Sequence, residues 1–120
     1  MRYIVLLNAE HPDTPPPAEL MAGIVALGEE ATRSGVLLDT AGLAPSAEGS
    51  RLTVRAGELS AVDGPFAETR ELISYAIYEV ATKAEVEEWT NRFLRLHRDL
   101  WPGWQGAASI HRVLDFGPPA

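Results

Sequence analysis

The segment Asp63-Gly64-Pro65-Phe66-Ala67-Glu68-Thr69-Arg70-Glu71 separates two different strand patterns in this 120-residue chain. Its Asp-Gly-Pro start is typical of a turn, since glycine adopts unusual backbone angles and proline has no N–H for a strand ladder. Before it, residues 51–55 alternate and 59–62 form a second short run, so a hairpin turning at 56–58 is predicted. After it, residues 72–80 are rich in Ile and Tyr and predict one longer strand.

The chain before the hairpin predicts a strand, a helix and a short strand. Residues 3–7 are uniformly apolar and favour a central strand, and 36–38 favour a short second one. Between them, apolar residues recur at helical spacing over 16–34, and Gly35 is placed to end the helix. We expect Gly23 and Gly28 to allow this helix to approach the sheet closely. Residues 41–50 are expected to form a loop.

The chain after the hairpin repeats this order. Thr82 and Glu85 form a capping-box pattern at the start of a second helix, on which Glu88 and Arg92 are expected to pair. Residues 101–104, Trp-Pro-Gly-Trp, end that helix, and 109–114 predict the last strand. The apolar stripe of this second helix consists of Val86, Trp89, Phe93, Leu96 and Leu100.

This order predicts a single α+β domain over residues 1–120. Two helices would cross one face of a mainly antiparallel sheet and leave the other face open. A second copy of the chain is the commonest cover for such a face, so we expect a homodimer.

Composition excludes several classes of function. The net charge of −7 disfavours nucleic acid and anionic membrane surfaces as partners. The absence of cysteine excludes thiolate metal sites and cysteine nucleophiles. No apolar run is long enough for a membrane span, and the first one is too short for a signal peptide, so we expect a cytoplasmic protein.

The segment at 63–71 also resembles the motif of the YCII-related DGPF family, in which Asp-Gly-Pro-Phe precedes Glu-Thr-Lys-Glu. The opening Met1-Arg2-Tyr3, the Gly42-Leu43-Ala44-Pro45 segment and the run from Phe93 through Trp104 are also similar. The resemblance implies a ferredoxin-like fold with an inserted hairpin, assembled as a dimeric α/β barrel. Members of the wider family are thought to carry a His–Asp acid–base pair, and others are associated with sigma factors.

The resemblance makes His111 and Asp63 the candidate catalytic residues. Here Ser109-Ile110-His111 stands where the family usually has Glu-Val-Arg, and the imidazole could exchange protons near neutral pH. We expect both side chains to line one cleft beneath the helices. The alternatives are a turn-capping role for Asp63 and a core or interface position for His111.

The expected substrate is small and apolar or aromatic, in a pocket walled by aromatic side chains. Ordinary core or dimer packing is the alternative for these aromatic residues, and a helix-terminal position favoured by the helix dipole is the alternative for His97. The candidate substrate-binding residues are Phe66, Tyr75, His97, Trp101, Trp104 and Ser109.

No histidine spacing or glycine-rich loop indicates a metal or a cofactor, and neither is expected. The predicted function is therefore cofactor-independent acid–base chemistry: elimination, dehydration, isomerisation or cyclisation. The alternative is a non-catalytic metabolite-binding module or one that contacts a sigma factor. We expect Arg51 and Arg55 to face solvent or to pair with acidic residues of a second copy.

Overall fold

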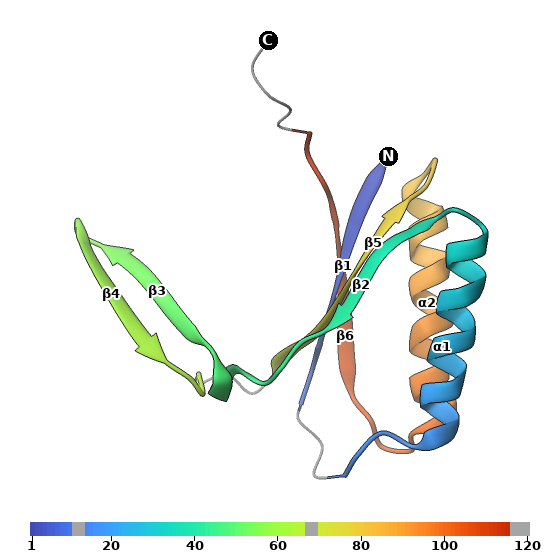
Figure 1. The fold of residues 1–120 in the computed structure, drawn as a ribbon, viewed down its shortest axis with the longest axis horizontal. Helices are drawn as coiled ribbons and strands as arrows, with labels where there is room; N and C mark the ends of the chain where they lie inside the picture. The colour runs from blue at the N-terminus through green and yellow to red at the C-terminus, as the bar shows by residue number, and fades with distance from the viewer. Residues whose placement is uncertain (11–13, 67–69, 116–120) are drawn as a thin grey trace.

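The structure is a computed structural model that describes residues 1–10, 14–66 and 70–115. It is an α+β fold, as predicted, with a four-stranded sheet in the order β2-β5-β1-β6 and every neighbouring pair antiparallel. Figure 1 shows α1 and α2 together on one side of this sheet. The arrangement is compatible with a ferredoxin-like fold. No helix in the described ranges is long and apolar enough to cross a membrane. The elements are β1 (Arg2–Ala9), α1 (Ala18–Arg33), β2 (Leu37–Gly42), the 3-10 helix η1 (Ser46–Glu48), β3 (Ser50–Arg55), β4 (Glu58–Asp63), β5 (Glu71–Glu79), α2 (Lys83–Leu100) and β6 (Gly106–Arg112).

Alternation along the central strand β1 separates the two faces of the sheet. Tyr3, Val5, Leu7 and Ala9 are buried beneath the helices. The residues between them point to the other face and are only half-buried. Tyr3 and Val5 join Ala31 of α1, Val86 of α2 and the strand residues Tyr78 and Val80 in the main hydrophobic core.

Helix α1 begins two residues later than predicted. Pro17 is its N-cap, with an extended ψ of 144°. Pro16 precedes a proline, and such a residue is held out of the helical region by a steric clash. The other end is as expected: Gly35 has φ 77°, its N–H donates to Thr32 O, and the next N–H donates to Ala31 O.

Helix α2 is capped as predicted, because Thr82 accepts a hydrogen bond from the Glu85 N–H at 3.3 Å. The predicted Glu88–Arg92 pair is present only as an electrostatic attraction, without a direct contact. Arg92 instead reaches across to Glu30 of α1 with bonds of 2.6 and 3.0 Å, and Glu88 pairs with Arg95. A bidentate contact uses two nitrogens of the guanidinium group, and it is therefore stronger than the pair along the helix.

Gly23 brings the two helices together. A Cβ atom there would lie 3.1 Å from Leu96 Cδ2 of α2, so glycine is needed for contact between helices and not with the sheet, contrary to the prediction. Gly28 has nothing within 4 Å of the same position, and the expected close approach is absent there too.

The edge strands differ in extent from their predicted bounds. β2 continues to Gly42, because Asp39 and Thr40 are stabilised by their neighbour β5. Thr40 Oγ1 donates to Tyr75 O at 2.8 Å, and the Tyr75 hydroxyl donates to Asp39 at 2.8 Å. At the other edge, β6 begins earlier than predicted, at Gly106, and ends at Arg112.

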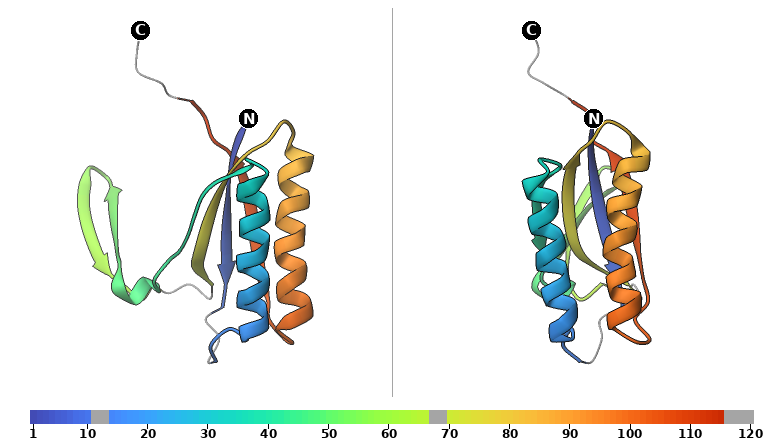
Figure 2. Two further views of the ribbon diagram at one scale, coloured as in Figure 1. Left: turned by 45° about the vertical axis from the view of Figure 1, so that its right-hand side comes forward. Right: turned by 90° about the vertical axis from the view of Figure 1, so that its right-hand side faces the viewer.

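The predicted hairpin is present as β3 and β4, which we call the arm. Ala56 and Gly57, with φ 50° and 81°, form its tight turn. Figures 1 and 2 show the arm projecting away from the four-stranded sheet, and its β3–β4 pair forms a separate sheet. Leu52 and Val54 are 75% and 70% exposed.

Gly64, Phe66 and Glu71 anchor the arm to the sheet. The Gly64 N–H donates to Gly49 O, and a Cβ on Gly64 would collide with the Ser46 carbonyl. Ser46 Oγ accepts from the Phe66 N–H at 3.2 Å and donates to Glu71 at 2.7 Å. The Asp-Gly-Pro-Phe motif therefore has a structural role: it fixes where the arm leaves the domain.

Candidate functional site

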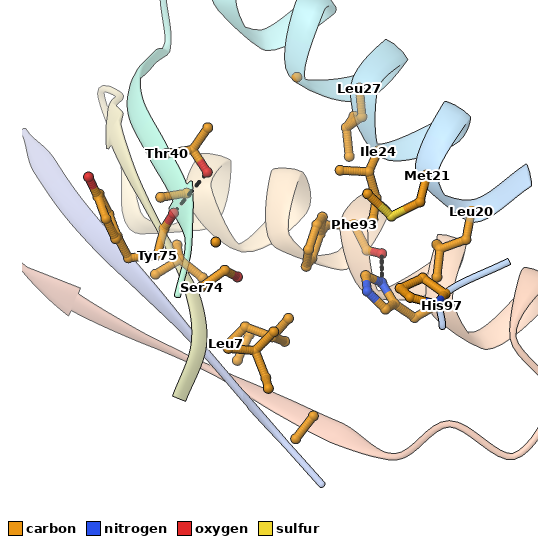
Figure 3. A pocket seen from close by; sticks show the side chains of 18 of the residues that line it. Leu7, Leu20, Met21, Ile24, Leu27, Thr40, Ser74, Tyr75, Phe93 and His97 are labelled. Atoms are coloured by element: carbon orange, nitrogen blue, oxygen red, sulfur yellow. Dashed lines mark hydrogen bonds between the residues drawn. The ribbon is translucent and has the colours of Figure 1, made fainter. Parts of the chain in front are cut away.

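The main hollow of the described residues lies between the helices and the sheet. Its volume is about 780 Å³, within the range of small-molecule sites. Figure 3 shows side chains from α1 and α2 on one side and from the strands on the other. Its apolar wall includes Leu7, Leu20, Met21, Ile24, Leu27 and Phe93.

Local structure positions these walls. Leu20, Ile24 and Leu27 follow the helical repeat on the inner side of α1, and Phe93 and His97 lie one turn apart on α2. Pro15 and Pro16 line the cavity just before α1 begins, and Pro17, the N-cap, is extended. The cavity is therefore built on rigid elements, not on a long loop.

His97 is one of two buried polar side chains in this wall, and it and Thr90 each have only 5% of their surface exposed. The Nδ1 atom of His97 lies 2.9 Å from Phe93 O. Because a carbonyl can only accept, Nδ1 carries the proton, and Nε2 of the neutral ring keeps its lone pair. Burial lowers the pKa of His97, while the bond to Phe93 O raises it by a smaller amount. The side chain is thus held neutral, with one acceptor nitrogen.

Two aromatic rings hold the imidazole in place. The ring centroids of Phe93 and Trp104 lie 4.6 and 4.4 Å from that of His97. Trp104 itself rests on the start of β6, where a Cβ on Gly106 would overlap its ring. Gly106 therefore makes room for Trp104, and Trp104 in turn packs against the imidazole of His97 and fixes its orientation.

Two hydroxyl groups around the cavity are committed to backbone partners. Thr90 Oγ1 donates to Val86 O at 2.7 Å, and Thr40 Oγ1 donates to Tyr75 O. Burial raises the pKa of Tyr78, so this side chain stays protonated at neutral pH. Ser74 lines the cavity with a hydroxyl for which the described residues provide no hydrogen-bond partner.

Nothing in the described part of the chain forms a metal site, since no three His, Cys, Asp or Glu side chains come together there. A second, shallower hollow of about 500 Å³ lies behind Trp101 and Trp104 and includes Arg70 and Arg98. Arg98 is held by Asp99 at 2.7 Å.

The cavity brings together four of the predicted site residues: Tyr75, His97, Trp101 and Trp104. Tyr75 touches the cavity only at its rim, because it opposes Leu6 of β1 and its side chain therefore faces away from the helices. Its hydroxyl is bonded to Asp39, which raises the pKa of the phenol, and Figure 3 shows its ring turned away from His97. His97 does lie in the last turn of α2, as the helix-terminal alternative has it, and burial is the dominant influence on its pKa there.

The other four predicted residues lie elsewhere. His111 and Ser109 oppose Ile4 and Leu6 of β1, and so face away from the helices. Asp63 ends the arm, and the Phe66 ring stacks under the Arg51 guanidinium at 4.1 Å. The expectation that Asp63 and His111 share a cleft beneath the helices is therefore wrong. Their catalytic role stays a prediction, without support from the geometry of one chain.

Sequence analysis did not predict the aliphatic wall of the cavity. Leu20, Ile24, Leu27 and Phe93 were recognised only as apolar residues at helical spacing. Such a stripe predicts which side of a helix faces inward, and it does not say whether that interior is filled.

Comparison with known families adds one finding. A model of the YCII-related domain matches residues 1–96. The chain belongs to the YCII-related domain family. The matched residues include β1, β2, the arm, β5 and most of α2, and stop just before His97. No curated protein matches the chain significantly.

Proposed function

We propose that this YCII-related protein binds a small apolar molecule in the cavity between helices and sheet, and that His97 transfers a proton to or from it without a cofactor. The observation that carries the proposal is a neutral, buried imidazole with a free acceptor nitrogen on an apolar cavity. In such surroundings a general base of lowered pKa is ready to accept a proton at neutral pH. The reaction class is elimination, dehydration, isomerisation or cyclisation.

His97 replaces His111 in this proposal for a geometric reason. A general base must lie within hydrogen-bond reach of the proton it removes, in a site that excludes water. His111 is exposed on the open face and the Asp63 side chain is exposed on the arm, whereas His97 is enclosed by Phe93 and Trp104.

Binding is tested by titration with N-phenyl-1-naphthylamine, an uncharged dye that fluoresces in apolar sites. Ala108→Phe fills the cavity beside Leu7, and its matched control Ala107→Phe points to the open face. We expect the first variant to lose the fluorescence increase and the second to keep it. Ser74→Leu fills the cavity from β5 if Ala108→Phe does not fold. Binding unchanged in both filled variants would place the dye elsewhere and reject the proposed site.

Catalysis is tested by deuterium uptake into 2-tetralone, a neutral aromatic ketone with acidic C–H groups, followed by NMR in D2O. We expect exchange faster than in buffer, and a fall of about 10²–10⁴-fold in His97→Gln, which cannot act as a base at this pH. His111→Gln should exchange as the wild type does. A probe that binds without any His97-dependent exchange would favour the non-catalytic metabolite-binding alternative.

The proposal includes a homodimer in which a second copy covers the open face. Ile4, Leu6 and Ile77 form an apolar centre on that face, and Asp39, Ser109 and His111 lie nearer its edges. An apolar centre with a polar rim is the usual anatomy of a protein interface. The exposed Leu52, Val54 and Leu59 of the arm add apolar surface outside the four-stranded sheet.

A further inference from the structure

The hydrogen-bonding state of His97 defines what its ligand must offer. Nδ1 is occupied by Phe93 O at 2.9 Å, and for Nε2 the described residues provide no hydrogen-bond partner. Every fully sealed side-chain nitrogen and oxygen in the same part of the chain is satisfied, so Nε2 is not sealed. The His97 ring lines the cavity, and Figure 3 shows the imidazole at one end of the space.

The charge of the cavity restricts the ligand further. No lysine or arginine is among the described residues that line it, and the one charged side chain is the exposed Glu10. A carboxylate or phosphate group would therefore lose its hydration without gaining a counterion, which is strongly unfavourable. The carboxylate of Glu10 would add repulsion.

From this geometry we infer that the cavity selects an uncharged, largely apolar ligand with a hydroxyl group, phenolic or enolic, that donates a hydrogen bond to His97 Nε2. The inference rests on the proposed function, because it concerns the ligand of the same cavity. An unprotonated Nε2 without a donor from the ligand would lose its hydration on binding, which disfavours ligands that lack the hydroxyl.

Three naphthalene probes separate the requirements. 2-Naphthol carries the hydroxyl, 2-methoxynaphthalene has the same apolar body without a donor, and 2-naphthoate is an anion at pH 7. We expect 2-naphthol to bind more tightly than the methyl ether by roughly 2- to 12-fold, the range of one neutral hydrogen bond. The naphthoate should bind about tenfold or more weaker than 2-naphthol, because its charge has no partner.

Variants at His97 assign this preference to Nε2. His97→Phe keeps a ring but has no acceptor, and the ratio of the two dissociation constants should fall to about one. His97→Gln keeps a carbonyl acceptor near the position of Nε2 and should retain part of the preference. His111→Phe is the matched control on the other face and should keep the wild-type ratio. Thermal unfolding checks that each variant folds. The ratio of the two dissociation constants in the wild type tests the hydroxyl requirement even if a variant does not fold.

The outcomes distinguish this inference from the function on which it rests. Equal binding of 2-naphthol and its methyl ether would overturn the hydroxyl requirement and leave the apolar cavity as a binding site. Tighter binding of the naphthoate would overturn it in favour of an anion site. Failure of all three probes to displace N-phenyl-1-naphthylamine would count against the proposed function itself.

Discussion

The two faces of the sheet treat the same residue type in opposite ways. His97 is enclosed against the helix-covered face, where burial lowers its pKa and two aromatic rings hold it. His111 is exposed on the open face, beside Ile4 of the neighbouring strand. A histidine acts as a base or ligand anchor when it is desolvated and oriented, and only His97 satisfies both conditions within one chain.

The comparison also shows what each face lacks. The covered face has walls but an unfilled interior of about 780 Å³, which a ligand could occupy. The open face has apolar side chains in the centre but no layer above them in the described chain, and another protein surface could supply it. One face is thus suited to a small molecule and the other to a second copy.

The largest expected effect is on assembly. Leu6→Glu would bury an unpaired charge at the centre of the proposed interface, at a cost of several kcal/mol. Light scattering at micromolar concentration should give about twice 13.0 kDa for the wild type and the mass of one chain for the variant. Ala107→Glu, further along the same face, should weaken the dimer less. A wild type with the mass of one chain would contradict the proposal that a second copy covers the open face.

A smaller effect separates two neighbouring leucines. Leu7 is 4% exposed beneath the helices, whereas Leu6 is half-buried on the open face. Leu7→Ala should lower the free energy of unfolding by about 2–3 kcal/mol, toward the low end for such changes because Leu7 already borders a cavity. Leu6→Ala should lower it by about 1 kcal/mol in dilute, monomeric protein, measured by urea denaturation. Equal losses would show that both faces are equally packed.

Gly106 tests how Trp104 is placed. Gly106→Ala puts a methyl group into the Trp104 ring, and overpacking of this kind costs about 1–3 kcal/mol. The matched control Gly42→Ala has nothing within 4 Å of the new atom and should change stability by less than about 1 kcal/mol. A moved Trp104 would also weaken dye binding in the cavity. If both alanine variants change stability equally, the close contact between Gly106 and Trp104 is not needed to place the indole ring.

The sequence predicted the elements and several end signals, because these depend on neighbouring residues. Thr82 caps α2, Gly35 ends α1, and the turn of the arm lies at Ala56 and Gly57. The period of two in a strand also places Ser109 and His111 on one face.

Which face that is depends on distant pairing. Only the alignment of His111 with Ile4, and of Ile110 with the buried Val5, directs His111 away from the helices. The direction of the arm depends on Gly64 and Ser46, which lie far apart in sequence. For these reasons the local sequence pattern could not test whether Asp63 and His111 lie together. The same pattern could not reveal the cavity between the helices and the sheet.

The smallest expected effect is the dependence of stability on pH through His97. Its pKa in the folded protein is lowered from the ordinary 6.5, mainly by burial. The unfolded chain therefore binds this proton more readily than the folded chain. The contribution of His97 to stability is fully present above about pH 6.5 and is lost as the pH falls toward the lowered value.

Urea denaturation between pH 7.5 and 5 should show this loss in the wild type and a flatter dependence in His97→Gln, which has no titrating group at this position. NMR of the imidazole C–H signals identifies His97 as the signal missing from that variant, and its midpoint should lie below 6.5. A midpoint above about 7 would mean that the ring is mostly charged at neutral pH. Nε2 would then carry a proton, and neither general-base action nor acceptance of a ligand hydroxyl could follow from its position.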